Sequence, residues 1–128
     1  MTQQVNLGER LRKIRAAKLA AERARDEARV RAAYEQSQRE RSSIHRTWCE
    51  YVSYVITQID QGKEPKGRKV PDVFVQDRVC LAYPGHSHHD IWQEMQTGAA
   101  QLGLEVSLVY CHDGMGMKDW YEIKVEPK

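Results

Sequence analysis

The sequence has few of the features that mark secreted or membrane-spanning proteins. It contains three cysteines, one phenylalanine and four prolines, and no apolar run of the roughly 20 residues needed to cross a bilayer. The N-terminal MTQQVNLGER lacks the hydrophobic segment of a signal peptide. The cysteines are odd in number, widely spaced and set in apolar segments, which favours buried free thiols over disulfides. We expect a soluble, cytoplasmic protein without a membrane partner.

Aromatic residues are scarce in the first third of the chain. Nine of the ten Phe, Trp and Tyr residues lie beyond position 41, whereas eight of the eleven alanines lie before it. Residues 1–41 carry eleven Lys and Arg against six Asp and Glu, a net charge of +5, and residues 42–128 carry nine against twelve, a net charge of −3. At 128 residues the chain has enough sequence for one modest core. We predict a basic helical arm, residues 1–41, and a compact α+β body, residues 42–128.

The arm belongs to a stretch without glycine or proline, from Glu9 to Gln61. Its composition favours a long helix, and its apolar residues recur every three or four positions as one narrow, alanine-rich stripe. A helix of this kind needs a contact to be stable, so we expect a homo-oligomer or a protein partner, with a solvated charged arm as the alternative. Whether residues 9–61 form one helix or a two-helix hairpin stays open. The candidate interface residues are Leu7, Leu11, Ile14, Ala21, Ala24 and Ala28.

A cluster of five cations without an acidic residue lies at positions 10–18 of the arm. Cations along one helix suit the phosphates of a nucleic acid, although no aromatic side chain interrupts the cluster to stack on bases. Nucleic-acid binding is therefore an alternative role for the arm. The candidate residues are Arg10, Arg12, Lys13, Arg15 and Lys18.

The remainder of the chain shows helix and strand patterns in alternation. An apolar face around Trp48 and Val55 predicts a core helix that ends near Gly62, and residues 62–72 are typical of an exposed loop. Residues 73–83 predict one long strand, or two strands with a turn at Gln76 and Asp77.

Beyond that turn, residues 87–102 predict a helix with Ser87 and Asp90 at capping-box spacing, and residues 104–111 predict a half-buried strand. A glycine-rich turn over 112–119 leads to a last strand at 120–125. We predict an α+β fold with the order α-α-β-α-β-β, a small mixed sheet and one helix packed on it.

The segment PGHSHHDIW, residues 84–92, holds three of the five histidines. If the strands before and after the 87–102 helix are parallel neighbours, their C-terminal ends meet, and this segment faces the residues that follow the second strand. The free N–H groups of the helix and the imidazoles would then form an anion or ligand site. The candidates are His86, Ser87, His88, His89, His112 and Asp113.

Two other interpretations of the same edge remain open. Histidine and cysteine are zinc ligands, so His86, His88, Cys111 and His112 are candidate metal ligands, with zinc as a candidate cofactor, although no established zinc-binding spacing is present. Alternatively, the segment is a polar loop in which Ser87 and Asp90 cap a helix and the histidines are solvated.

These patterns favour a non-enzymatic interaction protein, oligomeric or partner-bound through its N-terminal helix, by analogy with small accessory proteins of phages and mobile elements. One alternative is a metal-dependent hydrolase or nuclease that uses His86, His88 and His112. The other is nucleic-acid binding through the arm. Neither a GxSxG nor a Walker sequence is present.

Overall fold

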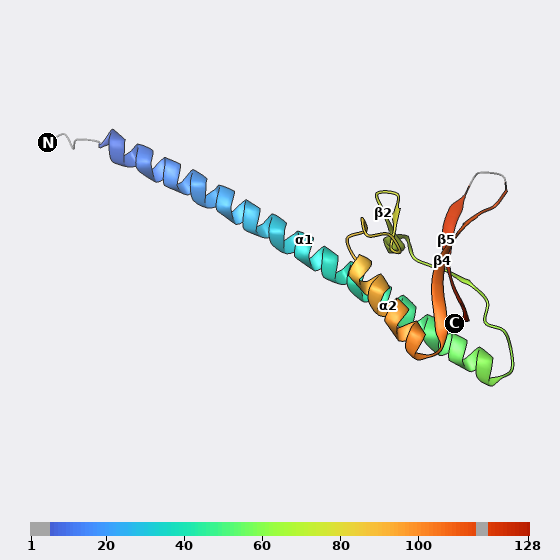
Figure 1. Ribbon diagram of the computed structural model, residues 1–128. Helices are drawn as coiled ribbons and strands as arrows, with labels where there is room; N and C mark the ends of the chain where they lie inside the picture. The colour runs from blue at the N-terminus through green and yellow to red at the C-terminus, as the bar shows by residue number, and fades with distance from the viewer. Residues whose placement is uncertain (1–5, 115–117) are drawn as a thin grey trace. The chain divides into compact units, whose positions relative to one another are not determined.

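The computed structural model describes residues 6–114 and 118–128 (Figure 1). The chain divides into two units, one ending at Gln38 and the other beginning at Arg39. The elements are, in order, helix α1 (Leu7–Asp60), strand β1 (Arg68–Lys69), the 3-10 helix η1 (Asp72–Phe74), strands β2 (Val75–Gln76) and β3 (Val79–Cys80), helix α2 (His89–Gln101), and strands β4 (Leu104–His112) and β5 (Asp119–Pro127).

Helix α1 is one continuous element, so the two-helix hairpin considered from the sequence is wrong, and the first two helices of the predicted order are one. Its start is capped by Asn6, whose Oδ1 accepts the N–H of Glu9 at 3.0 Å. Its end is closed by Gly62 at a φ of 70°, a left-handed conformation that glycine adopts without strain. The continuous helix follows from the absence of glycine and proline across this stretch.

The α+β class is confirmed, with two helices and small sheets, but every strand pair is antiparallel. Strands β1, β5 and β4 form one sheet in that order, and β2 and β3 form a separate two-stranded sheet. The predicted mixed sheet is therefore wrong. The segment expected to be only a loop, residues 62–72, contains β1, which adds a third strand beside β5.

Strands β2 and β3 form a tight hairpin, which confirms the two-strand alternative for residues 73–83. Its two turn residues, Asp77 and Arg78, have φ values of 49° and 65°. Two consecutive positive φ angles are the conformation of a type I′ turn, whose twist matches that of the flanking strands. The longer glycine-rich turn predicted at 112–119 includes residues 115–117, which lie outside the described residues.

Within the second unit, α2 lies beside the last part of α1 and runs parallel to it (Figure 1). Arg41 contacts Asp90 and His45 contacts Glu94, so the residue offset between the helices is the same at both contacts. One helical turn further along, the Trp48 indole lies over Gly98. A Cβ at this position would lie 3.9 Å from the indole Nε1, an ordinary contact distance, so the indole leaves room for a small side chain but not for a large one.

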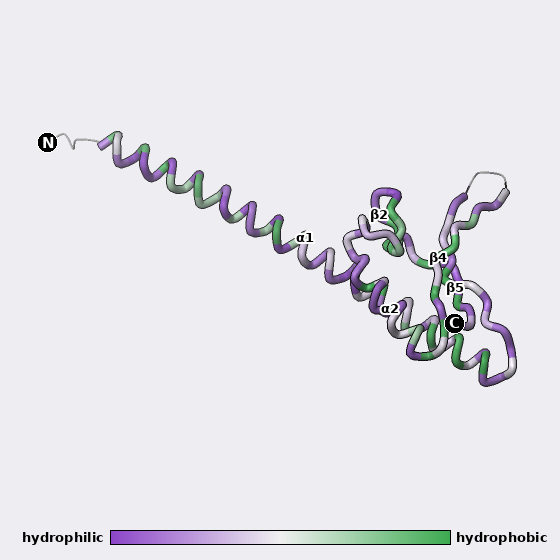
Figure 2. The backbone as a smooth tube through the Cα atoms, viewed as in Figure 1, coloured by the Kyte–Doolittle hydropathy of each residue, from purple (hydrophilic) through white to green (hydrophobic). Residues whose placement is uncertain are grey.

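The core forms where these two helices cover one face of the three-stranded sheet. It contains Ile44, Tyr51 and Val55 from α1, four residues of α2, and Val106 and Ile123 from the sheet. Val70, Phe74 and Leu81 complete it. Figure 2 shows hydrophobic residues concentrated in these segments and hydrophilic residues predominating in the first unit.

The connection between α1 and β1 is held by two tyrosines. The buried Tyr51 hydroxyl donates to the Lys66 carbonyl oxygen at 3.1 Å, and the Lys66 N–H donates to the Tyr54 hydroxyl at 3.2 Å. Burial raises the pKa of Tyr51 to about 12. Arg68 lies over the Tyr54 ring, 4.6 Å from its centre. Among the described residues, no helix combines the length and the apolar character needed to span a membrane.

Candidate functional site

The histidine segment lies between β3 and α2, and it is part of the core boundary, not a solvated loop. His86 and His88 are 4% and 3% exposed. Ser87 is exposed, and His88 occupies the N-cap position of α2 without a side-chain capping bond, so the predicted capping box of Ser87 and Asp90 is wrong. The apolar residues on both sides of the segment, Leu81 and Ile91, are fully buried and draw it inward.

His86 uses both ring nitrogens within the protein. Its Nδ1 accepts the backbone N–H of His88 at 3.0 Å, so the neutral ring carries its hydrogen on Nε2, which donates to the Val73 carbonyl oxygen at 3.1 Å. Burial lowers the pKa of His86, and the nearby His88 adds to that effect. A neutral imidazole with two hydrogen bonds has no lone pair left for a metal or a substrate.

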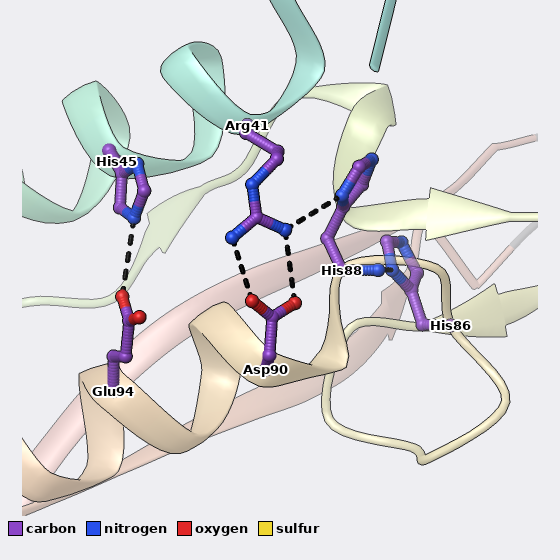
Figure 3. Close-up of polar contacts among 6 residues, drawn as sticks. All are labelled: Arg41, His45, His86, His88, Asp90 and Glu94. Atoms are coloured by element: carbon purple, nitrogen blue, oxygen red, sulfur yellow. Dashed lines mark hydrogen bonds and ion pairs between the residues drawn. The ribbon is translucent and has the colours of Figure 1, made fainter. Parts of the chain in front are cut away.

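His88 lies between two charged side chains of α1, Arg41 and Glu40. Figure 3 shows its contact with Arg41. Its Nδ1 is 3.4 Å from Arg41 Nη1, and its Nε2 is 3.6 Å from Glu40 Oε2. Because Arg41 can only donate, Nδ1 is the acceptor and Nε2 carries the hydrogen that faces Glu40. The ring thus bridges the cation and the carboxylate.

Arg41 also holds Asp90 by two parallel hydrogen bonds, Nη1 to Oδ1 at 3.0 Å and Nη2 to Oδ2 at 2.7 Å (Figure 3). The hydrogen bond with Arg41 lowers the pKa of Asp90, and the same bond raises the pKa of Arg41. His45 Nε2 contacts Glu94 Oε2 at 3.3 Å one turn further along. These contacts join α1 to the N-terminal half of α2.

Glu40 has a second partner in the β2–β3 hairpin. Gln76 Nε2 donates to Glu40 Oε2 at 2.6 Å. The other amide atom, Gln76 Oε1, is buried and has no hydrogen-bond partner among the described residues. Sequence reasoning missed Glu40 and Arg41, because both lie far along the chain from the His88 that they contact. It missed Gln76 because the contact of that residue with Glu40 spans 36 residues.

We predicted that the histidine segment and the residues at the end of β4 meet at one sheet edge, but the strand pairing that would bring them together is not the one observed. The prediction required the strand before α2 and the strand after it to be parallel neighbours, but β3 pairs only with β2, and β4 pairs with β5. Cys111 is half-buried on β4, and His112 is exposed at the end of that strand. The two strands lie in different sheets, so their ends are not brought to one edge.

The four candidate zinc ligands, His86, His88, Cys111 and His112, are therefore not assembled into one site. Within residues 6–114 and 118–128, no group of three or more His, Cys, Asp or Glu side chains is placed to hold a metal ion. Of the remaining candidates, His89 Nδ1 donates to the Leu81 carbonyl oxygen at 2.9 Å, and His112 Nδ1 accepts the Gly114 N–H at 3.2 Å. Asp113 is exposed, and its N–H donates to the Lys118 carbonyl oxygen.

A cleft of about 450 Å³ lies in the second unit, between β1 and η1 on one side and the β4–β5 hairpin on the other, and none of its lining residues is a histidine. Its walls mix aromatic, cationic and acidic side chains, and a hydrogen bond with Asp119 raises the pKa of Tyr110 at its rim. Opposite charges are balanced around it, so no ligand charge is favoured. The lining residues are Lys69, Val70, Pro71, Asp72, Val75, Arg78, Tyr110, Asp119, Trp120 and Tyr121.

In the first unit, the predicted interface residues lie along α1 and all are exposed. Six large apolar side chains of this unit are 46–70% exposed: Leu7, Leu11, Ile14, Leu19, Val30 and Tyr34. The five candidate phosphate-binding cations are exposed as well, and Lys13 forms a 3.8 Å ion pair with Glu9.

Comparison with known proteins gives no functional lead, because no family model, curated protein or solved structure matches the chain.

Proposed function

We propose that the protein is a non-enzymatic interaction protein, and that the first unit, residues 7–38, binds a protein partner through its apolar stripe, a second copy of the chain being the simplest partner. The exposure of Leu7, Leu11 and Ile14 on a folded helix is the observation that supports this most directly. Exposed large apolar side chains lose their contact with water when a second surface covers them.

The alanines that continue the stripe set the geometry of this contact. Ala21, Ala24 and Ala28 recur at spacings of three and four, so they lie on one face with Leu7 and Ile14. Small side chains permit close approach of another helix but bury little area, which suits a long contact of modest affinity. The histidine cluster supports the non-enzymatic side of the proposal, since its buried rings are engaged within the protein. His86 contacts the Val73 carbonyl oxygen and the His88 N–H, and His88 contacts Glu40 and Arg41 of α1.

The test replaces two stripe alanines by charged residues, Ala21→Glu with Ala28→Glu, in the full-length chain. Charge at a helix–helix contact opposes association, and glutamate keeps the helix propensity high. Sedimentation or native mass measurements should show a smaller assembly than the wild type. A wild-type chain that is monomeric at high concentration and captures no partner through residues 7–38 overturns the proposal.

A charge-matched control is available on the opposite face of the helix. Arg12→Gln with Arg23→Gln changes the net charge by the same amount and leaves the stripe intact. We expect this variant to assemble as the wild type does. If both variants lose association equally, net charge and not the stripe governs it.

A further inference from the structure

Strand β4 lies at an edge of the three-stranded sheet, because the strand order is β1, β5, β4. It is nine residues long, Leu104–His112, with neither proline nor lysine, the residues that commonly protect an edge. Beyond β5 it has no neighbouring strand in the described chain. A long edge of this kind offers backbone groups to another strand.

The hydrogen-bond pattern shows which backbone groups point outward. Residues of β4 pair with β5 in a continuous register from Leu104 with Pro127 to His112 with Asp119. Just beyond the two ends of that register, Lys128 donates to the Gly103 carbonyl oxygen and Asp113 donates to the Lys118 carbonyl oxygen. Directly opposed residues of antiparallel strands alternate between bonded and non-bonded pairs, so the odd-numbered residues of β4 bond β5.

The even-numbered residues of β4 therefore direct their N–H and C=O groups to the free edge. Within the described residues, no backbone or side-chain hydrogen bond reaches the N–H or C=O of Leu108 or Tyr110. Tyr110 is 52% exposed, and His112 is exposed at the end of the strand. Unpaired backbone groups on a regular strand are satisfied either by water or by a further strand.

We propose that β4 pairs antiparallel with β4 of a second copy of this chain, joining two three-stranded sheets into one of six strands. This surface lies in the second unit, so the inference does not rest on the stripe of the first unit. A two-fold axis at Leu108 places even-numbered residues opposite even-numbered residues, so the outward-directed N–H and C=O groups of the two strands face each other, and the bonded pairs alternate with non-bonded pairs as an antiparallel ladder requires.

The residues of β4 are compatible with a second copy as the partner, because the symmetric register opposes no like charges. The only carboxylate of β4 is Glu105, and in this register it lies opposite the neutral Cys111 of the second copy. Val106 then lies opposite Tyr110 of the second copy, a pairing of a β-branched with an aromatic residue that stabilises sheets. No like charges are opposed along the new ladder.

The test is residue-resolved amide hydrogen exchange of the full-length chain at low and high protein concentration, about 1 µM and about 100 µM. The N–H groups of Leu108 and Tyr110 should exchange about tenfold or more slowly at the high concentration, because the ladder protects them only in the dimer. The N–H groups of Ser107 and Val109 point to β5, so they should be protected at both concentrations and serve as internal references. Fast exchange of Leu108 and Tyr110 at both concentrations overturns the proposal, and so does protection at both, which would show that the chain covers its own edge.

The same measurement on the variant Ala21→Glu with Ala28→Glu separates this edge from the stripe. If the N–H groups of Leu108 and Tyr110 are still protected at high concentration in this variant, pairing through β4 is supported even if the stripe does not mediate association. Loss of the protection in that variant shows that the first unit causes it, and overturns the edge contact.

A matched pair of substitutions gives a second readout in that same background. Both Tyr110→Pro and Tyr110→Ala remove the tyrosine ring. The proline variant also lacks the outward-pointing backbone N–H, whereas the alanine variant retains that N–H. Sedimentation should detect dimers of the alanine variant and monomers of the proline variant. Equal behaviour of the two, once circular dichroism shows that both are folded, contradicts the edge ladder. If the proline variant is unfolded, the exchange pattern of the wild type decides alone.

Discussion

Arg41 and Asp90 are joined by two hydrogen bonds of 3.0 and 2.7 Å although 48 residues separate them in the sequence. Arg41 belongs to α1, and Asp90 lies in the first turn of α2, where a carboxylate is also favoured by the helix dipole. His45 and Glu94 repeat the relationship one turn later. The two helices are thereby aligned in parallel at the boundary of the core.

Asp90→Asn should lower the free energy of unfolding at pH 7 by about 0.5 to 1 kcal/mol, a small value because the Asp90 side chain is 55% exposed to screening solvent. The pKa of Asp90 is lowered in the folded state, so its contribution is present above the ordinary carboxyl pKa of 3.8 and is lost as the pH falls further. Urea unfolding of both proteins at pH 7 and near pH 3 measures this. Glu94→Gln, at the more exposed pair with His45, should lower the free energy of unfolding by less than Asp90→Asn does. A difference between wild type and Asp90→Asn that is unchanged near pH 3 contradicts the assignment.

His86→Leu should destabilise the second unit by about 2 to 4 kcal/mol, because it leaves the Val73 carbonyl and the His88 N–H without partners in a buried site. The pKa of His86 is lowered in the folded state, so below the ordinary value of 6.5 the unfolded chain binds the proton more readily. Wild-type stability should therefore fall as the pH drops through 6.5, and this part of the slope should vanish in His86→Leu. His112→Leu is the control, because His112 is exposed and its replacement should change the free energy of unfolding by no more than about 0.5 kcal/mol.

Gly98→Ala should raise the free energy of unfolding by about 0.5 to 1 kcal/mol, because alanine is the better helix former. A Cβ at Gly98 would lie 3.9 Å from Trp48 Nε1 and 4.0 Å from its Cζ2, which are ordinary contact distances. A leucine would extend beyond that contact, and Gly98→Leu should destabilise by separating α2 from α1. Thermal unfolding compares the three proteins, and a stable leucine variant would show that the helices do not pack closely here.

Replacement of Arg10, Arg12, Lys13 and Arg15 by glutamine tests the nucleic-acid alternative for the first unit. If these cations bind phosphates, duplex DNA binding should weaken, and its logarithmic salt slope should fall by about 0.9 for each phosphate that the variant no longer neutralises. Fluorescence anisotropy at several salt concentrations gives the slope. Arg29→Gln is the control, since that guanidinium is already 3.2 Å from Asp26. No binding by the wild type at low salt rules the alternative out.

Several elements could be predicted because their causes are local. The stretch without glycine or proline predicts the long helix, and Gly62 marks its end. The alternation of apolar residues in 104–111 identifies β4 and its inward face, because a strand places successive side chains on opposite faces. The positions of these elements follow from backbone preferences and periodicity, which a single sequence contains.

Strand pairing could not be predicted in the same way. We inferred a parallel strand-helix-strand unit because strands joined through a helix are usually parallel neighbours. In the structure β3 pairs with β2 in a hairpin, and β4 pairs with β5. Pairing depends on which backbone groups find partners across the chain, and strand periodicity is the same for parallel and antiparallel neighbours.

By itself the sequence determined that residues 9–60 are helical, that a second helix lies within 87–102 and that the first unit is basic and alanine-rich, since these follow from neighbours within a few residues. It left open whether residues 9–61 form one helix or two. Only the tertiary structure decided that His86 and His88 are buried, that Arg41 reaches Asp90 and that β4 lies at a sheet edge. Those outcomes depend on contacts between residues far apart in the chain. A hydrogen bond or an ion pair of this kind leaves no periodic signal in either of the segments that it joins.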